Sequence, residues 1–238
     1  DKEALRRGTS VYLVDRVIPM FPEAISNGCC SLNSGEDKLA LSCIMEINDK
    51  GKVVSHKIVE SVINVNMRMA YSDVAEILEK DSVETHPLYT EFYGLLKDME
   101  KLAGILRKKR EGRGSIDFDI PEFKMTLDKR GKVVDIKAYQ RNVATNIIEE
   151  FMLITNETVA EEYFWLELPF VYRIHDKPDP DKMKELSIFI NNFGFSLKAL
   201  NNEIHSKELQ KLLNKIKGTG EEALISRITL RNMKQAKY

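Results

Sequence analysis

Two aromatic side chains of this 238-residue chain follow clusters of basic residues. Tyr12 lies in the apolar stretch TSVYLV, directly after Arg6 and Arg7. Phe118 lies in SIDFDIP, shortly after the basic run that ends at Arg113. An aromatic ring can stack on any nucleotide base, because every base has a π-face. Taken alone, each residue is better explained as a core aromatic, since aromatics in strands are usually buried.

The densest positive patch of the chain is predicted to occupy the end of a helix, before a loop broken by Gly112 and Gly114. It consists of five cations: Arg107, Lys108, Lys109, Arg110 and Arg113. Two explanations stay open. Cations at a helix C-terminus stabilise the helix by about 0.3–1 kcal/mol each at low salt. The same cations could bind phosphates, and each contact with a single strand would then cost about 0.7 log units of affinity per decade of salt.

Carboxylates also occur in pairs on a predicted helix. Glu149 and Glu150 are adjacent, and adjacent helical residues point about 100° apart, so they cannot chelate one ion together. Glu150 aligns with Glu157 and Glu161 in an acidic stripe, which predicts that it faces solvent. Tyr71, at the start of another predicted helix, is explained on sequence alone by packing or a hydrophobic staple.

Several other chemistries find little support in the sequence. Three cysteines, two of them adjacent at Cys29 and Cys30, predict no disulfide framework and favour a reduced, cytoplasmic setting. The four histidines lack metal-binding spacing, so no protein-bound metal is expected, and no phosphate-binding glycine loop occurs. In VYRIHDKP, Arg173 and His175 lack a catalytic partner and are predicted to be structural. Neither a membrane span nor a signal peptide is predicted, and the net charge of −1 leaves RNA binding to local surfaces.

The pattern of hydrophobic residues predicts one α+β unit made of hairpins and helices. Two hairpins are expected around similar turns, at 38–65 and 123–139, because each has β-branched runs beside a polar turn with glycine. Helices are expected at 71–80, 87–110, 142–166, 180–192, 206–216 and 221–237. No composition shift marks a domain boundary.

Five segments together resemble the RNB domain of the ribonuclease II and ribonuclease R exoribonucleases, most closely the ribonuclease R branch. They are RRGTSVYLVDRVIPMFPEAISNGCCSLN from Arg6 to Asn33, RGSIDFDIPE, RNVATNIIEEFM, VYRIHDKP and LRNMKQAKY. The resemblance covers essentially the whole chain. It implies an RNB-type catalytic domain, with a sheet and several helices around an RNA channel.

The resemblance also implies an activity and roles for particular residues. Members remove nucleoside monophosphates processively from RNA 3′ ends with magnesium, so single-stranded RNA is the expected partner. Tyr12 would be catalytic by positioning the 3′-terminal nucleotide, and Phe118 would clamp the other end of the stacked bases. Tyr71 and Glu149 would contact the nucleotide near the 3′ end, including the ribose 2′-hydroxyl that distinguishes RNA from DNA.

Two motifs of the resembled family have no counterpart in residues 1–238: its aspartate-rich metal motif and its later Ser-Pro-Ile-Arg-Arg motif. Asp117 and Asp119 share a face of an extended segment, yet two carboxylates do not replace four. The chain is therefore expected to be a partial domain that needs other parts of its polypeptide, binds no Mg²⁺ itself and is inactive alone. The alternative is a non-catalytic RNA-binding protein that keeps an RNB-like fold.

Overall fold

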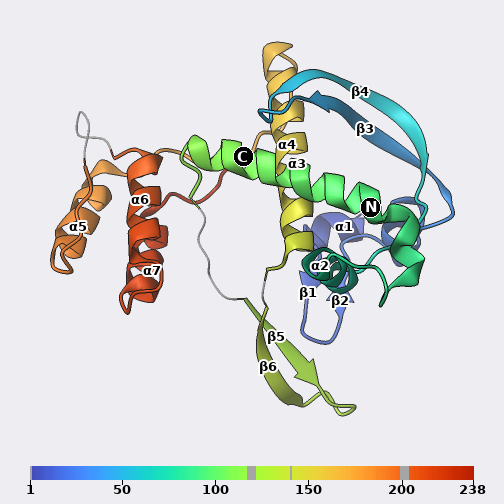
Figure 1. Ribbon diagram of the computed structural model, residues 1–238, viewed down its shortest axis with the longest axis horizontal. Helices are drawn as coiled ribbons and strands as arrows, with labels where there is room; N and C mark the ends of the chain where they lie inside the picture. The colour runs from blue at the N-terminus through green and yellow to red at the C-terminus, as the bar shows by residue number, and fades with distance from the viewer. Residues whose placement is uncertain (1, 117–121, 140, 199–203) are drawn as a thin grey trace. The chain divides into compact units, whose positions relative to one another are not determined.

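The computed structural model describes residues 2–116, 122–139, 141–198 and 204–238 (Figure 1). The chain forms two compact units: residues 1–103 with 121–155, and residues 104–120 with 156–238. Helix α3 and helix α4 each begin in the first unit and end in the second. This division falls inside two continuous helices, which explains why no change in composition marks it.

The elements alternate between short antiparallel strand pairs and helices, which confirms the predicted α+β class. In chain order they are α1 Lys2–Arg7, β1 Val11–Tyr12, β2 Val17–Ile18, the π-helix η1 Ala24–Cys29, β3 Asp37–Ile47, β4 Val53–Asn64, α2 Tyr71–Lys80, the 3-10 helix η2 Pro87–Phe92, α3 Tyr93–Gly112, β5 Glu122–Leu127, β6 Val133–Tyr139, α4 Val143–Trp165, α5 Pro180–Asn191, α6 Ser206–Ile216 and α7 Glu222–Asn232.

Both predicted hairpins are confirmed, and their turns use the same chemistry. In the β3–β4 turn, Asn48 Oδ1 accepts hydrogen bonds from the backbone N–H groups of Lys50 and Lys52, at 3.0 and 2.9 Å. In the β5–β6 turn, Asp128 Oδ1 accepts from the backbone N–H groups of Arg130 and Lys132, at 2.8 and 2.9 Å. Gly51 and Gly131 follow with φ of 72° and 78°, a left-handed conformation that glycine adopts at low cost. The sequence GKVV occurs at both 51–54 and 131–134 because the two turns have the same geometry.

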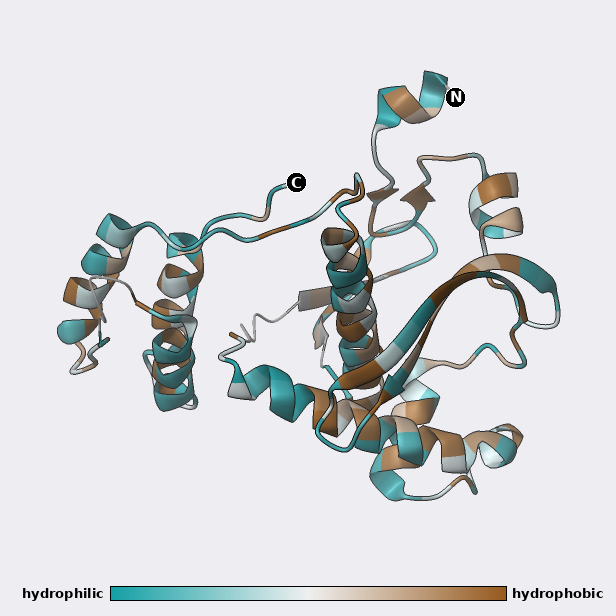
Figure 2. Cartoon of the chain, turned by 90° about the horizontal axis from the view of Figure 1, so that it is seen from above, coloured by the Kyte–Doolittle hydropathy of each residue, from teal (hydrophilic) through white to brown (hydrophobic). Residues whose placement is uncertain are grey.

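The first unit is built around α2, η2, α3 and α4, which enclose a common apolar core. The most deeply placed residues come from all four elements: Val74, Ala75, Ile77, Leu78, Tyr89, Leu96, Ala103, Ala144 and Ile147. In Figure 2 these helices carry hydrophobic residues beside hydrophilic ones, as expected for amphipathic helices with one buried face. Tyr89 also orders the start of α2, because its hydroxyl donates to Asp73 at 3.0 Å and accepts from the Ala70 N–H at 3.3 Å.

The second unit has its own core between α5, α6 and α7. It is formed by Met183, Leu186, Ile190, Leu209, Leu212, Ile216 and Ile225. Helix α5 begins as its sequence predicts, with Pro180 in the first turn and Asp179 accepting a hydrogen bond from the Asp181 N–H at 2.9 Å. The chain end joins this unit through an antiparallel bridge between Ile174 and Lys237.

Two of the predicted helix boundaries are wrong. The helix predicted at 87–110 is a 3-10 turn over Pro87–Phe92 followed by α3, since proline at the first position suits a new helical start. The helix predicted at 221–237 ends at Asn232, because the following residues extend to pair with Ile174. Neither α1 nor η1 is among the helices expected from the sequence.

One buried hydroxyl of the second core provides a test of its packing. Thr229 is fully buried on α7, and its Oγ1 has no hydrogen-bond partner among the described residues. Replacing this hydroxyl by a methyl group removes the desolvation cost of an unpaired polar atom. Thr229→Val is expected to raise the free energy of unfolding by about 1 kcal/mol, measured by urea denaturation.

Thr219 provides the matched control for this substitution. Its Oγ1 donates to the Ile216 carbonyl at 2.7 Å, at the end of α6. Thr219→Val should lower the free energy of unfolding by about 0.5–1.5 kcal/mol, because a hydrogen bond is lost. Destabilisation by both substitutions would show that the Thr229 hydroxyl is paired after all.

Candidate nucleic-acid interface

Tyr12 is presented on a small hairpin in the first unit. It pairs with Val17 across β1 and β2, and its side chain is 80 % exposed. The hairpin is tied at its base, where the Met20 N–H donates to Ser10 Oγ at 2.9 Å and Arg7 Nη1 donates to the Pro19 carbonyl at 2.5 Å. The explanation of Tyr12 as a core aromatic therefore does not hold in this structure, and its ring is available to a ligand.

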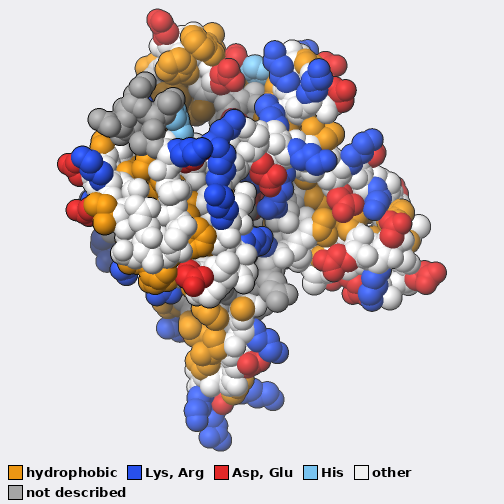
Figure 3. All heavy atoms as spheres, turned by 60° about the vertical axis from the view of Figure 1, so that its left-hand side comes forward, with side chains coloured by type: hydrophobic (Ala, Val, Ile, Leu, Met, Phe, Trp, Pro, Cys, Tyr) orange, Lys and Arg blue, Asp and Glu red, His pale blue; other side chains and the backbone are white. Residues whose placement is uncertain are grey.

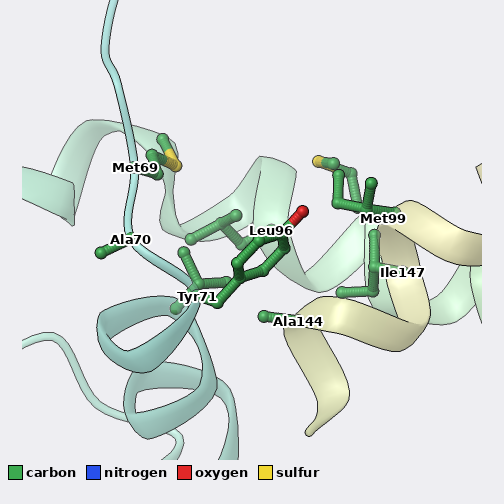
Figure 4. A pocket seen from close by; sticks show the side chains of 9 residues that line it. Met69, Ala70, Tyr71, Leu96, Met99, Ala144 and Ile147 are labelled. Atoms are coloured by element: carbon green, nitrogen blue, oxygen red, sulfur yellow. The ribbon is translucent and has the colours of Figure 1, made fainter. Parts of the chain in front are cut away.

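Tyr71 begins α2 and is half exposed at 49 %. The rest of its ring borders an apolar cavity of about 180 Å³ within the first unit. The cavity is lined by residues from α2, the segment before it, α3 and α4: Met69, Ala70, Tyr71, Val74, Leu96, Met99, Ala144, Ile147 and Ile148. Figure 4 shows the Tyr71 ring close to Leu96 and Ala144. Packing thus fixes the ring, while its exposed part can still meet a ligand.

Glu149 lies on α4 directly after Ile148, which lines the same cavity as Tyr71. Its side chain is 39 % exposed, and one carboxylate oxygen is 3.9 Å from Arg141 Nη1. An exposed pair at this distance contributes little to stability, so it leaves the carboxylate available for other hydrogen bonds. The structure therefore brings the helices that carry Tyr71 and Glu149 together around one cavity.

The prediction that Glu150 faces solvent is wrong, because its side chain is only 3 % exposed. Glu150 lies within a buried stripe of α4 that also contains Ala144, Ile147 and Ile154. The predicted partner Glu157 is exposed, but it lies on the part of α4 that belongs to the second unit. Periodicity aligned the two glutamates correctly along one helix. It gave no information on which part of the helix other elements cover.

The basic run at the end of α3 lies in the second unit, and its members differ in their surroundings. Its arginines make local contacts: Arg107 Nε to Glu111 at 3.2 Å, Arg110 Nη1 to Ser115 Oγ at 2.5 Å, and Arg113 to both carboxylate oxygens of Glu157. Lys108 and Lys109 are exposed. Lysine and arginine side chains also spread over the face shown in Figure 3, mixed with acidic ones. The contacts of the arginines thus fit the structural explanation, and phosphate binding by the run stays a prediction.

Helix α6 fixes the end of α3. Gln210 Nε2 donates to the carbonyls of Glu111 and Ser115, at 3.0 and 2.9 Å, and so satisfies two acceptors at the helix terminus. Between them, Gly114 has a φ of 96° and lies directly against α6. These contacts hold the basic run in a defined place on the second unit.

The described residues do not fit a magnesium site. Among them, no group of three or more histidine, cysteine, aspartate or glutamate side chains is placed to hold a metal ion. Asp117, Asp119 and the predicted clamp residue Phe118 lie outside the described residues. The described part of the chain also contains no helix long and apolar enough to span a bilayer.

The two units together define a known class of domain: the RNB domain family matches residues 1–238, and the chain belongs to this family. Its relatives include ribonuclease R of Thermotoga maritima, 44 % identical over 239 residues, and ribonuclease R 1 of Lactococcus lactis, 41 % identical over 238 residues. Both alignments cover all of this chain, but 33 % and 29 % of those relatives. The chain thus spans about a third of their length, and the predicted resemblance is confirmed.

Solved structures agree with the family assignment. Mycoplasma genitalium RNase R in complex with ribose methylated single-stranded RNA matches 99 % of this chain and 37 % of its own, with a TM-score of 0.91 and 25 % identity. The same enzyme in complex with double-stranded RNA also gives a TM-score of 0.91. Yeast Ssd1, a pseudonuclease, shares the fold with a TM-score of 0.74 and 22 % identity.

The contact between Gly114 and α6 can be tested by substitution. A Cβ atom on Gly114 would lie 2.7 Å from Lys207 Cγ and 3.1 Å from the Lys207 backbone nitrogen. Gly114→Ala is expected to lower the free energy of unfolding by about 1–2 kcal/mol, because alanine also disfavours positive φ. Gly112→Ala is the control, since a Cβ there meets nothing within 4 Å. Equal stabilities of the two variants in urea denaturation would contradict this contact.

Proposed function

We propose that this chain is the RNA-holding part of a processive 3′→5′ exoribonuclease of the ribonuclease R kind, which hydrolyses RNA to nucleoside monophosphates. The main support is the RNB family match over residues 1–238 together with 44 % identity to a ribonuclease R. Because the chain spans about a third of those relatives, the proposed activity is that of the whole protein. Single-stranded RNA is its proposed partner, in the cytoplasm.

In this proposal Tyr12 stacks on the base of the 3′-terminal nucleotide and thereby positions the scissile phosphate. The exposure of its ring and the anchored base of its hairpin support this role. Stacking on one base is worth about 1–3 kcal/mol and does not depend on base identity. This suits an enzyme that must accept each nucleotide in turn. Phe118 is proposed to bracket the other end of the stacked bases.

Tyr71 and Glu149 are proposed to recognise the sugar near the 3′ end. A phenol hydroxyl can donate or accept, and a carboxylate accepts from ribose hydroxyls, including the 2′-hydroxyl that DNA lacks. Their support is their position, since both belong to helices around one cavity and both are partly exposed. The cavity wall holds the Tyr71 ring, so the hydroxyl is presented with little loss of rotamer freedom.

The basic run is proposed to neutralise RNA phosphates, mainly through Lys108 and Lys109. Their exposed side chains lie next to arginines that already bind Glu111, Ser115 and Glu157. Phosphate contacts of this kind position a strand without reading its sequence. They therefore fit an enzyme that moves along RNA of any sequence.

Hydrolysis itself is proposed to require Mg²⁺, bound by aspartates in other parts of the whole polypeptide. Such an ion would stabilise charge on the attacking and leaving oxygens. The described residues provide no ligand group for it, so the contribution of this chain is to hold and orient the RNA. By itself the chain is proposed to be inactive.

Substitution of Tyr12 in the whole protein tests the stacking role. Tyr12→Ala is expected to lower the rate of 3′-end degradation of single-stranded RNA by about 5- to 100-fold, the equivalent of one lost base stack. Tyr12→Phe keeps the ring and should change the rate by less than about threefold. Leu39→Ala, at a similarly exposed position on β3, is the control. Equal rates for Tyr12→Ala and the unsubstituted protein would exclude the stacking role.

Product analysis tests the activity as a whole. The whole protein, incubated with single-stranded RNA and Mg²⁺, should release nucleoside monophosphates, and the 238-residue chain alone should release none. Release by the isolated chain would show that its own residues suffice for hydrolysis. RNA binding by the whole protein without product would instead support the alternative of a non-catalytic RNA-binding protein.

A further inference from the structure

Two adjacent thiols lie on the surface of the first unit. Cys29 ends η1 and Cys30 follows it, and both side chains are exposed. Their sulfur atoms are 3.9 Å apart. Cys43, on β3, is only partly exposed and belongs to a different element. The first two cysteines therefore form a preformed surface dithiol.

The backbone on both sides of this dithiol is held by hydrogen bonds. The Cys30 N–H donates to the Ile25 carbonyl at 3.0 Å and closes the last turn of η1. The Gly28 carbonyl accepts from the Ser31 N–H at 3.2 Å and from the Lys38 ammonium at 3.0 Å. The Lys38 side chain is largely buried, so it links the end of η1 to the start of β3. A ligand can therefore bind both sulfurs without a large rearrangement of the backbone.

The distance between the sulfurs permits both to bond one central atom. Bonds from a metal to thiolate sulfur measure about 2.3 Å, so one centre can join two sulfurs that lie up to about 4.6 Å apart. The hydrogen bond between the two thiols raises the pKa of Cys30, so this thiol stays protonated near neutral pH. A centre that binds both sulfurs must therefore displace the thiol protons.

The number of protein ligands restricts what this centre can be. A structural zinc ion takes four protein ligands, whereas the described residues place no third histidine, cysteine, aspartate or glutamate beside the two thiols. Soft thiolate sulfur selects soft, thiophilic centres. The dithiol therefore fits a thiophilic atom that forms two bonds to protein sulfur and whose third substituent is part of the bound compound.

We propose that Cys29 and Cys30 form a binding site for monosubstituted compounds of trivalent arsenic. In the reaction, two thiols meet an R–As(OH)₂ species, two As–S bonds form and two As–O bonds break. The two thiol protons leave with the hydroxyl groups as two molecules of water. Arsenic stays trivalent and no oxidant is needed. The product is a ring that includes both sulfurs and the peptide bond between the two residues.

Ring formation constrains the end of η1. Both sulfurs are then fixed to one atom, so the segment from Ala24 to Asn33 loses conformational freedom. Amide hydrogens in this segment should consequently exchange more slowly in the adduct. The β1–β2 hairpin with Tyr12 precedes this segment, but the binding site does not rest on any role in RNA degradation.

The test uses the whole protein and phenylarsine oxide as the probe. Mass spectrometry of proteolytic peptides should place one arsenical on the peptide that contains Cys29 and Cys30. A large excess of a monothiol should leave this adduct in place, whereas 2,3-dimercaptopropanol should remove it, because only a dithiol can form a competing ring. Hydrogen exchange measured on the same sample should slow in residues 24–33.

Three single variants identify the ligands. Cys29→Ser and Cys30→Ser should each abolish the adduct that resists monothiol, while Cys43→Ser should retain it. Urea denaturation confirms that each variant is folded, and serine at the exposed positions 29 and 30 should change the midpoint little. The proposal is overturned if the folded protein forms no adduct on this peptide, if a monothiol removes it, or if either Cys29→Ser or Cys30→Ser keeps it.

Discussion

The apolar core that α2, α3 and α4 share is the constraint on which the candidate interface depends. Each helix contributes a buried alanine to it: Ala75 on α2, Ala103 on α3 and Ala144 on α4. Larger residues of the same core, such as Ile77 and Ile147, fill the space around them. Tyr71 and Glu149 owe their positions to this packing, since each is attached to a helix that the core orients.

In the second unit, contacts from a neighbouring helix likewise fix the end of α3. The last turn of α3 would normally expose unpaired carbonyls, and Gln210 on α6 supplies donors to two acceptors in this region. Arg113 adds a two-pronged contact with Glu157 on α4. A dense row of cations thus contains arginines that hold the local structure, while the side chains of Lys108 and Lys109 are exposed.

Local signals predicted most elements, and tertiary contacts explain the errors. The hairpins follow from Asn48 and Asp128, whose side chains close the turns without help from the rest of the chain. Helix α6 matches its predicted bounds because its apolar repeat is strong, with Leu209, Leu212 and Ile216 buried on one face. The early end of α7 results from a strand-like bridge to Ile174, which is distant in sequence. No local pattern encodes such a partner, and the same applies to the burial of Glu150.

The candidate interface shows how binding and hydrolysis can be separated within one fold. Base stacking needs an exposed ring on an anchored hairpin, and sugar recognition needs polar groups beside a packed cavity; the described residues offer both. Metal-assisted hydrolysis needs several carboxylates converging on one point, which the described residues do not offer. The two requirements fall on different residues, so loss of such carboxylates need not disturb the helices that carry Tyr71 and Glu149. A fold of this kind can therefore persist as a binding protein after its chemistry is lost.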